Sequence, residues 1–466
     1  MVAIKDSKAE AAPATGQDST TTEPKSDSQQ DGADRVSKPL DIIFLQDTTG
    51  SQGQYIDAAR KAIRGICDKI STSADISKEL IRFGLIAFRD HPPQDMTYVT
   101  KNFGFTSDIK QMERNLASLI ASGGGDGPEA QTAAIADALN TEWTEDAMKI
   151  VILITDAPPH GLGEPGDGFD KSPDQNDPLE LARQMAERGI TLFLIACEPT
   201  LSQSYTHALD FYTALTDITS GRVFPLLMAD KLGDYIVGTV VETIETERLI
   251  EEFEKVIVDD VYNKAKPMEA VTQNLQQFIA DRGIKMTSMK VEDIYTHSAE
   301  AEKNRATWGS APSLAAGRAG VKAVTEPRIQ AAYASETARW AGSGSFGSRS
   351  RGSARVAGGP PLPRSAMPLA PPPPTGYAMP APGISLAAAS AQPAEGDGFY
   401  VKAAISERQA STNFRFLDNE LGLIHSISQA ARIVQQSVSR SSKVTSEGYV
   451  SKASGLKVPN QFEQKH

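Results

Sequence analysis

Apolar residues between Leu40 and Trp308 follow two alternating patterns. Continuous apolar runs, such as LDIIFLQD (residues 40–47) and MKIVILITD (residues 148–156), are typical of strands that are buried on both faces. Between such runs, apolar residues recur every three or four positions, as from Ile56 to Ile70, and this spacing predicts helices. Strands that alternate with helices predict an α/β fold: a doubly wound, mostly parallel sheet with helices on both faces.

The same patterns place the other elements of this fold. Further strands are expected at residues 80–88, 97–105 (an edge strand), 189–197 and 221–227, and further helices at 107–120, 128–140, 205–219 and 230–263. Thr106 or Ser107 is the expected N-cap of the helix after the edge strand, and Asp177 that of a helix opening with proline. The glutamates between Glu242 and Glu254 predict a solvated helix face.

Composition divides the chain of 466 residues into segments around this one domain. Polar stretches and stretches rich in Pro, Ala, Gly and Ser bury too little apolar surface to fold, and are expected to be disordered. The predicted segments are a disordered N-terminal arm (1–38), the α/β domain (39–255), a helical extension (256–310), a disordered linker (311–400) and a basic tail with an amphipathic helix over 414–439 (401–466).

The formal net charge of -12 is unevenly distributed. Acidic residues are in excess within residues 40–310, whereas the chain beyond carries more Lys and Arg than Asp and Glu. An acidic domain repels nucleic acid and attracts cations, so no nucleic-acid partner is expected. The basic tail has two open roles: it binds acidic partners, or it folds back onto the acidic domain.

Cysteine content and hydropathy predict a cytoplasmic protein. The two cysteines, Cys67 and Cys197, lie in apolar runs and are expected to be buried thiols in a reducing compartment. The N-terminal sequence has no apolar core of the kind found in secretory signals. No apolar run reaches the length of a membrane span, so none is expected.

Oxygen-bearing side chains follow two of the predicted strands. Asp47, Thr49 and Ser51 lie at the end of the first strand, Asp156 ends a second, and Asp126 lies in a glycine-rich loop before a helix. Ligands of open parallel sheets bind beyond the carboxyl ends of the strands. Carboxylates and hydroxyls are ligands for hard cations, so these five residues predict a site for Mg²⁺, or for Mn²⁺ or Ca²⁺. The alternative is that they form ordinary turns and helix caps.

Other polar residues near these strand ends have less specific patterns. Glu129 is expected to contact the metal ligands, or only to favour the first turn of its helix. His160 is expected at the rim of the metal face, or alternatively in a solvent-exposed loop. His91 follows a strand in the sequence RDH and is expected to be a loop residue near the sheet end, the alternative being a catalytic or metal-binding histidine.

The motifs DTTGS, GGGDGPEA and ILITDAPPH together resemble the von Willebrand factor type A domain and its metal-ion-dependent adhesion site, over about residues 39–255. The resemblance implies that Asp47, Thr49, Ser51 and Asp156 are metal ligands. Asp126 takes the place of the usual middle-loop threonine, as in the A domains of alpha-kinase and hemicentin-like proteins, although no kinase segment follows here. The resemblance further implies a binding module, not an enzyme, in which an acidic residue of a partner completes the metal's coordination.

Three functions remain open on these residues. The first is divalent-cation-dependent protein binding, with disordered arms that recruit further partners; the second is a scaffold whose metal is only structural. The third, a Mg²⁺-dependent phosphohydrolase, lacks a phosphate-binding G-x-x-x-x-G-K-[ST] motif. A separate docking segment is expected in PPLPR, where Pro360, Pro361 and Pro363 suit a WW or SH3 domain.

Overall fold

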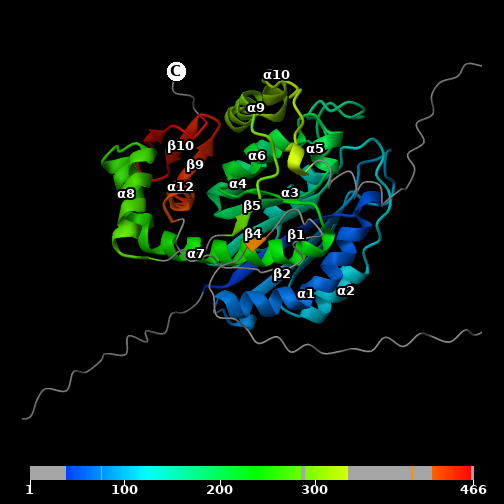
Figure 1. Cartoon of the computed structure of the whole chain (residues 1–466), viewed down its shortest axis with the longest axis horizontal. Coiled ribbons are helices and arrows are strands. Elements are labelled where there is room, and N and C mark those ends of the chain that lie inside the picture. Colours follow the sequence, from blue (N-terminus) through cyan, green and yellow to red (C-terminus); the bar gives the residue numbers. More distant parts are fainter. Residues whose placement is uncertain (1–37, 75, 285–288, 334–399, 402–421, 463–466) are drawn as a thin grey trace, which may run out of the picture. The chain divides into compact units, whose positions relative to one another are not determined.

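A computed structural model describes residues 38–74, 76–284, 289–333, 400–401 and 422–462 (Figure 1). The predicted N-terminal arm up to residue 37 and most of the predicted linker, including the PPLPR segment, lie outside the described residues. Among the described helices, none combines the length and apolar character that a membrane crossing requires.

A six-stranded sheet forms the centre of the domain, in the order β3-β2-β1-β4-β5-β6. Its strands are β1 (Leu40–Asp47), β2 (Ile81–Phe88), β3 (Thr100–Thr106), β4 (Met148–Thr155), β5 (Ile190–Cys197) and β6 (Val223–Leu226). All neighbours pair in parallel except β3, which runs antiparallel to β2 at the edge. The predicted α/β class, with a mostly parallel sheet and an edge strand after β2, is confirmed.

Helices cover both faces of this sheet (Figure 1). One face packs against α1 (Gly53–Ala74), α2 (Ile109–Ala117) and α7 (Leu232–Val258), and the other against α3 (Gln131–Asn140), α4 (Pro178–Glu187) and α6 (Ala208–Ile218). Short helices in the connections are η1 (Gly50–Gln52), η2 (Lys78–Leu80), α5 (Thr200–Ser204) and η3 (Ala229–Lys231). Because both faces are covered, the strands read as continuous apolar runs.

Two helix starts show how side chains define the ends of these elements. Asp177 accepts a hydrogen bond from the backbone N–H of Leu179 at 3.0 Å and precedes Pro178, so the predicted cap of α4 is confirmed. The predicted cap of α2 is wrong by one or two residues. Asp108, rather than Thr106 or Ser107, accepts the hydrogen bond from the backbone of Lys110, at 2.9 Å.

The chain beyond α7 packs back onto the domain. A π-helical turn (Asp259–Asn263) leads to α8 (Met268–Asp281), β7 (Lys290–Val291), α9 (Ala299–Ser310) and α10 (Leu314–Gly320). Trp308 of α9 is fully buried, 5.3 Å from the ring of Phe211 in α6. The predicted extension is therefore partly non-helical and part of the core. Helix α10 lies within the predicted linker (311–400), and its Leu314 is buried beside α9. The predicted start of the linker at residue 311 is therefore too early.

The C-terminal tail folds back onto α7 and α8. It comprises α12 (Gly422–Arg440) and the strands β9 (Ser442–Thr445), β10 (Gly448–Ser451) and β11 (Lys457–Val458), while β8 (Tyr400–Val401) pairs with β7. Gln436 donates to Thr191 at 3.2 Å, at the start of β5. The described part of α12 thus packs by the edge where strands begin, away from the predicted metal ligands at the strand ends.

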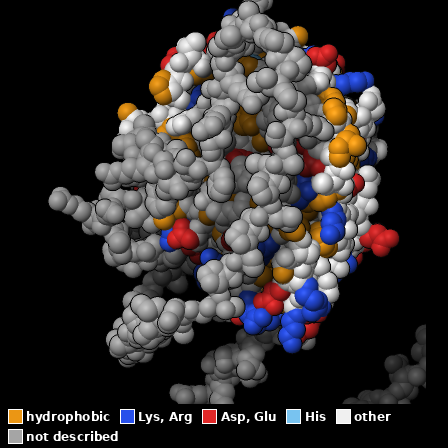
Figure 2. All heavy atoms as spheres, turned by 90° about the vertical axis from the view of Figure 1, so that its right-hand side faces the viewer, with side chains coloured by type: hydrophobic (Ala, Val, Ile, Leu, Met, Phe, Trp, Pro, Cys, Tyr) orange, Lys and Arg blue, Asp and Glu red, His pale blue; other side chains and the backbone are white. Residues whose placement is uncertain are grey.

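Two glutamates of α7 do not lie on a solvated face, which corrects that prediction. Glu242 is buried between Arg222 and Arg432, and Glu247 forms two hydrogen bonds with Arg440, at 2.5 and 2.7 Å. The tail supplies two of these arginines, so its folding back onto the acidic domain is confirmed. Elsewhere, Figure 2 shows a face with Lys and Arg beside Asp and Glu, and with hydrophobic side chains among them.

Packing of the tail predicts that Ile433→Ala destabilises the protein. Ile433 is fully buried against α7 and α8, and the cavity left by such a change typically costs about 2–5 kcal/mol. Ile427, in the same helix, is 48% exposed and serves as the matched control; Ile427→Ala should change the free energy of unfolding by no more than about 0.5 kcal/mol. Urea denaturation measures both, and equal losses would contradict the packing described here.

Candidate metal centre

The pairing of β1 with β4 brings two acidic residues to one edge of the sheet. The strands are parallel, with Gln46 opposite Ile154, so Asp47 at the end of β1 lies near Asp156, just beyond β4. Both carboxylates are buried. This is the edge at which ligands of open α/β sheets bind.

Hydroxyl groups hold the carboxylate of Asp47 in place. Its Oδ1 accepts hydrogen bonds from the backbone N–H and the Oγ1 of Thr49, at 2.9 and 2.7 Å. Its Oδ2 accepts one from Oγ1 of Thr155, at 2.7 Å. Both oxygens therefore have fixed positions at the end of β1 before any ion arrives.

The carboxylate of Asp156 is tied to the same loop. Its Oδ1 accepts hydrogen bonds from Oγ of Ser51 at 3.0 Å and from Nε2 of Gln52 at 2.7 Å. The structure thus brings together four of the predicted ligands, with Thr49 bonded to Asp47 and Ser51 bonded to Asp156. Gln52 was not predicted, because glutamine has no metal-ligand signature in this position of the motif.

These buried acids disfavour one another's charge. Burial, and after it the charge of the nearby Asp156, raise the pKa of Asp47 to about 7, although the hydrogen bonds from Thr49 and Thr155 lower it. Burial also raises the pKa of Asp156. A divalent cation between the two carboxylates offsets this repulsion, so the donor set suits such an ion.

Glu129 lies beside the first motif. A Cβ added to Gly124, where φ is +83°, would be 2.7 Å from Oε1 of Glu129 and 3.4 Å from Cβ of Thr49. Only glycine leaves room for this approach. Burial, followed by the charges of Asp47 and Asp90, raises the pKa of Glu129 to about 11. In the part of the chain that the structure describes, Oε2 of Glu129 has no hydrogen-bond partner.

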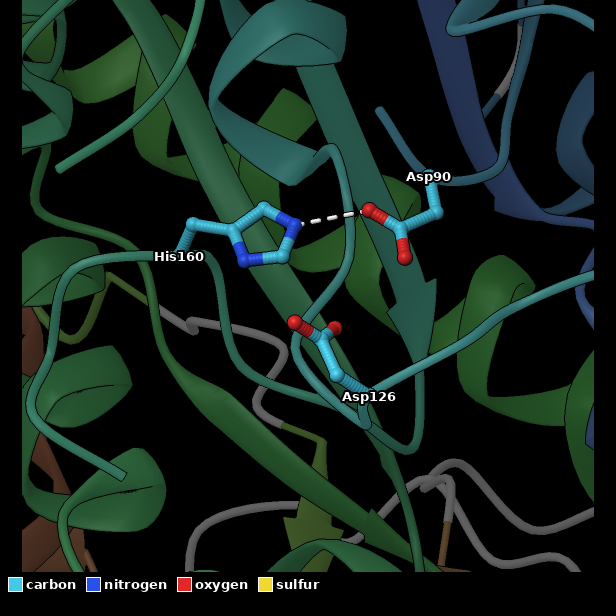
Figure 3. Close-up of side chains that lie close together, drawn as sticks. All are labelled: Asp90, Asp126 and His160. Carbon is cyan, nitrogen blue, oxygen red and sulfur yellow. Dashed lines mark hydrogen bonds and ion pairs between the residues drawn. The ribbon is translucent and has the colours of Figure 1, made fainter. Parts of the chain in front are cut away.

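Asp126 points to a different set of residues from Asp47. Its Oδ2 accepts hydrogen bonds from the backbone N–H of Gly168 at 2.5 Å and from Nε2 of Gln94 at 3.1 Å. One possible ligand atom from each of Asp126, Asp90 and His160 lies within 4.8 Å of the others, and Figure 3 shows the three side chains pointing toward one another. Ligation by Asp126 of the ion at Asp47 stays a prediction.

His160 is a buried residue and not part of an exposed loop surface. Its Nε2 lies 2.7 Å from Oδ1 of Asp90, and its Nδ1 lies 2.8 Å from Oδ1 of Asp167. Burial opposes charging of the imidazole, but the hydrogen bonds to Asp167 and Asp90 outweigh it and raise the pKa of His160 to about 9. His91 is buried as well, with its ring centre 5.8 Å from that of His160.

Asp90 is the functional candidate that the sequence analysis missed. It follows β2, and the strand order places β2 next to β1, so the end of β2 lies at the same edge as Asp47. The order of strands in the sheet was the signal that could have identified Asp90. An acidic residue shortly after a central parallel strand lies near the ends of the neighbouring strands.

The fold, with carboxylates and hydroxyls gathered at its strand ends, defines a class of α/β domain. The family model of the von Willebrand factor type A domain matches residues 41–223. The chain contains a von Willebrand factor type A domain, and domains of this family are commonly protein-interaction modules rather than enzymes.

Two relatives share part of this sequence. An ariadne-like RING finger protein of Acanthamoeba polyphaga mimivirus is 28% identical over 194 residues, which is 40% of this chain and 18% of that protein. The alpha-protein kinase vwkA of Dictyostelium discoideum is 29% identical over 127 residues, which is 27% of this chain and 20% of that protein. The chain thus matches about a fifth of the length of each relative.

The solved structures that match this chain share little sequence with it. The pilus adhesin SpaC of Lactobacillus rhamnosus GG is 13% identical, with a TM-score of 0.35, over 45% of this chain and 31% of the adhesin. A von Willebrand factor type A protein of Catenulispora acidiphila is 16% identical, with a TM-score of 0.30, over 45% of this chain and 43% of that protein.

The geometry predicts that Mg²⁺ stabilises the protein through Asp47. An ion that binds only the folded state contributes about 2.7 kcal/mol at a concentration of 100 times its Kd. Thermal unfolding with Mg²⁺ and with chelator should show a higher Tm with Mg²⁺ for the wild type and no difference for Asp47→Asn. Asp146→Asn, which changes an exposed acid before β4, should respond like the wild type. The same shift in all three proteins would contradict ligation by Asp47.

Proposed function

We propose that the domain binds a protein partner through a divalent cation, Mg²⁺ or else Mn²⁺ or Ca²⁺, held by Asp47, Thr49, Ser51 and Asp156. The observation that carries the proposal is the pairing of each hydroxyl with a carboxylate: Thr49 with Asp47 and Ser51 with Asp156. These groups supply the hard oxygen ligands that such ions require. Asp126 is proposed as an additional acid of the site.

The position of Ser51 gives the ion a side open to solvent. Ser51 is exposed, whereas Asp47 is fully buried, so the ion would have protein ligands beneath it and solvent above. Mg²⁺ usually keeps several waters in its octahedral shell. A glutamate or aspartate of a partner protein can replace one of these waters and complete the coordination.

Two exposed apolar side chains extend this surface beyond the ion. Met96 is 78% exposed and Ile120 is 69% exposed, although large apolar residues usually avoid solvent. Arg89 connects their loops, since it donates to Oγ1 of Thr97 and to the backbone oxygen of Ile120, each at 2.7 Å. Apolar contacts of this kind supply binding energy at the centre of protein interfaces.

The loop of Ile120 also contacts the metal motif directly. The backbone N–H of Ser122 donates to the oxygen of Thr48 at 3.0 Å, and that of Gly50 donates to Gly123 at 3.2 Å. A partner that places an acidic residue on the ion therefore meets Ile120 on an adjoining loop. This combination favours protein binding over a metal that only supports the fold.

Further recruitment through the flanking arms belongs to the same proposal. The segment with Pro360, Pro361 and Pro363 is proposed to dock a WW or SH3 domain, and it lies outside the described residues. A cytoplasmic location is proposed because Cys67 and Cys197 are both buried free thiols, which suit a reducing compartment.

Partner capture should require both the ion and its ligands. The full chain is immobilised and used to capture proteins from lysate with Mg²⁺, with chelator, and as the Asp47→Ala/Asp156→Ala variant. Quantitative mass spectrometry should find specific partners with Mg²⁺ only, and at least tenfold less of each in the other two conditions. Identical partner lists in all three would overturn metal-dependent binding, provided that circular dichroism shows the variant to be folded.

Substitutions of the exposed apolar residues Met96 and Ile120 should separate partner binding from metal binding. Ile120→Asp and Met96→Asp each place a charge in the proposed interface and should reduce capture of the Mg²⁺-dependent partners by at least tenfold, or about 1.4 kcal/mol. Their Tm should still rise with Mg²⁺. Val256→Asp is the matched control, because Val256 is 59% exposed on α7, and it should leave capture unchanged. Loss of capture in the control alone would place the interface elsewhere.

A further inference from the structure

A second group of possible ligands lies beside the site at Asp47 and contains none of Asp47, Thr49, Ser51 and Asp156. Asp90 follows β2, Asp126 precedes α3, and His160 follows β4. One possible ligand atom from each lies within 4.8 Å of the other two. In Figure 3 the two carboxylates and the imidazole approach one common space from three separate loops.

Buried carboxylate oxygens at this position are candidate ligands for a cation. Asp90 is fully buried, and its Oδ2 has no hydrogen-bond partner among the residues that the structure describes. Within the same described residues, Oδ1 of Asp126 is also buried without a partner. A buried carboxylate oxygen without a partner carries an uncompensated desolvation cost. A cation bound to both carboxylates removes this cost at two residues at once.

The orientation of His160 suits a metal ligand. Asp167 fixes the ring by accepting from its Nδ1, at 2.8 Å, and is held in turn by the backbone N–H groups of Gly161 and Phe169, at 2.7 and 2.9 Å. Metal-ligating histidines usually donate their other ring N–H to such a carboxylate. Nε2 is then directed at Asp90, where an ion can take the place of the proton between them.

We propose that Asp90, Asp126 and His160 bind a first-row transition-metal ion, such as Zn²⁺ or Mn²⁺, at a site distinct from that of Asp47. One imidazole nitrogen and two carboxylates are a mixed ligand set that suits these ions, whereas Mg²⁺ prefers oxygen ligands alone. Three protein ligands leave coordination positions for water. This inference does not rest on the proposed function, because it needs none of Asp47, Thr49, Ser51 and Asp156; if it holds, Asp126 belongs to the second site.

The second ion would also affect the first site through Glu129. A Cβ added to Gly124 would lie 2.7 Å from Oε1 of Glu129 and 3.4 Å from Cβ of Thr49, and Glu129 follows Asp126 by three residues. Glu129 is therefore close to the first motif and belongs to the same loop as Asp126. An ion at His160 joins the three loops around Glu129, and so holds the middle loop against the first motif.

Metal titration of the full chain tests the proposal. The protein is stripped with chelator, dialysed, and titrated with Co²⁺ as a spectroscopic probe and with Zn²⁺ by calorimetry. The wild type should show a Co²⁺ visible absorption band that Zn²⁺ abolishes. His160→Gln and Asp126→Asn should each weaken binding at this site by at least about tenfold. Asp47→Asn should retain the band, because it changes only the other site.

His297→Gln is the matched control. His297 is an exposed histidine that also lies beside an aspartate, Asp293, and its loss should leave the Co²⁺ band unchanged. If His160→Gln does not fold, as judged by circular dichroism, Asp126→Asn decides, since Asp126 is only partly buried. The proposal is overturned if the wild type gives no band, if both of these ligand variants bind like wild type, or if only Asp47→Asn loses the band.

Discussion

Repulsion between carboxylates that share a buried sheet edge is the constraint on which this structure depends. The parallel pairing of β1 with β4 fixes Asp47 and Asp156 near each other, and burial weakens the screening that water would provide. Neighbouring hydroxyl groups reduce the electrostatic cost of this repulsion. Those of Thr49, Ser51 and Thr155 donate hydrogen bonds to the two carboxylates. Hydrogen bonds alone do not cancel the charge, and this supports the proposal that the site binds a cation.

Much of the fold could be predicted because its signals are local. A strand covered on both faces must be apolar throughout, so β1, β4 and β5 were visible as runs, and the residues that end β1 and β4 had to share an edge once the sheet was parallel. The arrangement of the middle loop could not be predicted in this way. Asp126 and Glu129 are three residues apart, and which of them faces Asp47 depends on a backbone with positive φ at Gly124 and Gly127.

The tail shows a second limit of local patterns. The glutamates of α7 have the spacing of a solvated helix face, and nothing within that helix distinguishes Glu242 or Glu247 from their exposed neighbours. Their partners, Arg432 and Arg440, lie almost two hundred residues later in the chain. A buried ion pair is stable only when both partners are present. The glutamates of the acidic domain therefore need the arginines of the basic tail to compensate their charges.

The return of the tail to α7 changes what the intervening sequence can do. The described residues on either side of positions 334–399 lie on one folded body, because Ile329 is buried before that stretch, and after it β8 pairs with β7 and α12 packs on α7. A protein bound to the docking segment proposed at Pro360 is therefore covalently linked to the domain from both sides. Such a link raises the effective concentration of the bound protein near the domain without any contact between the two.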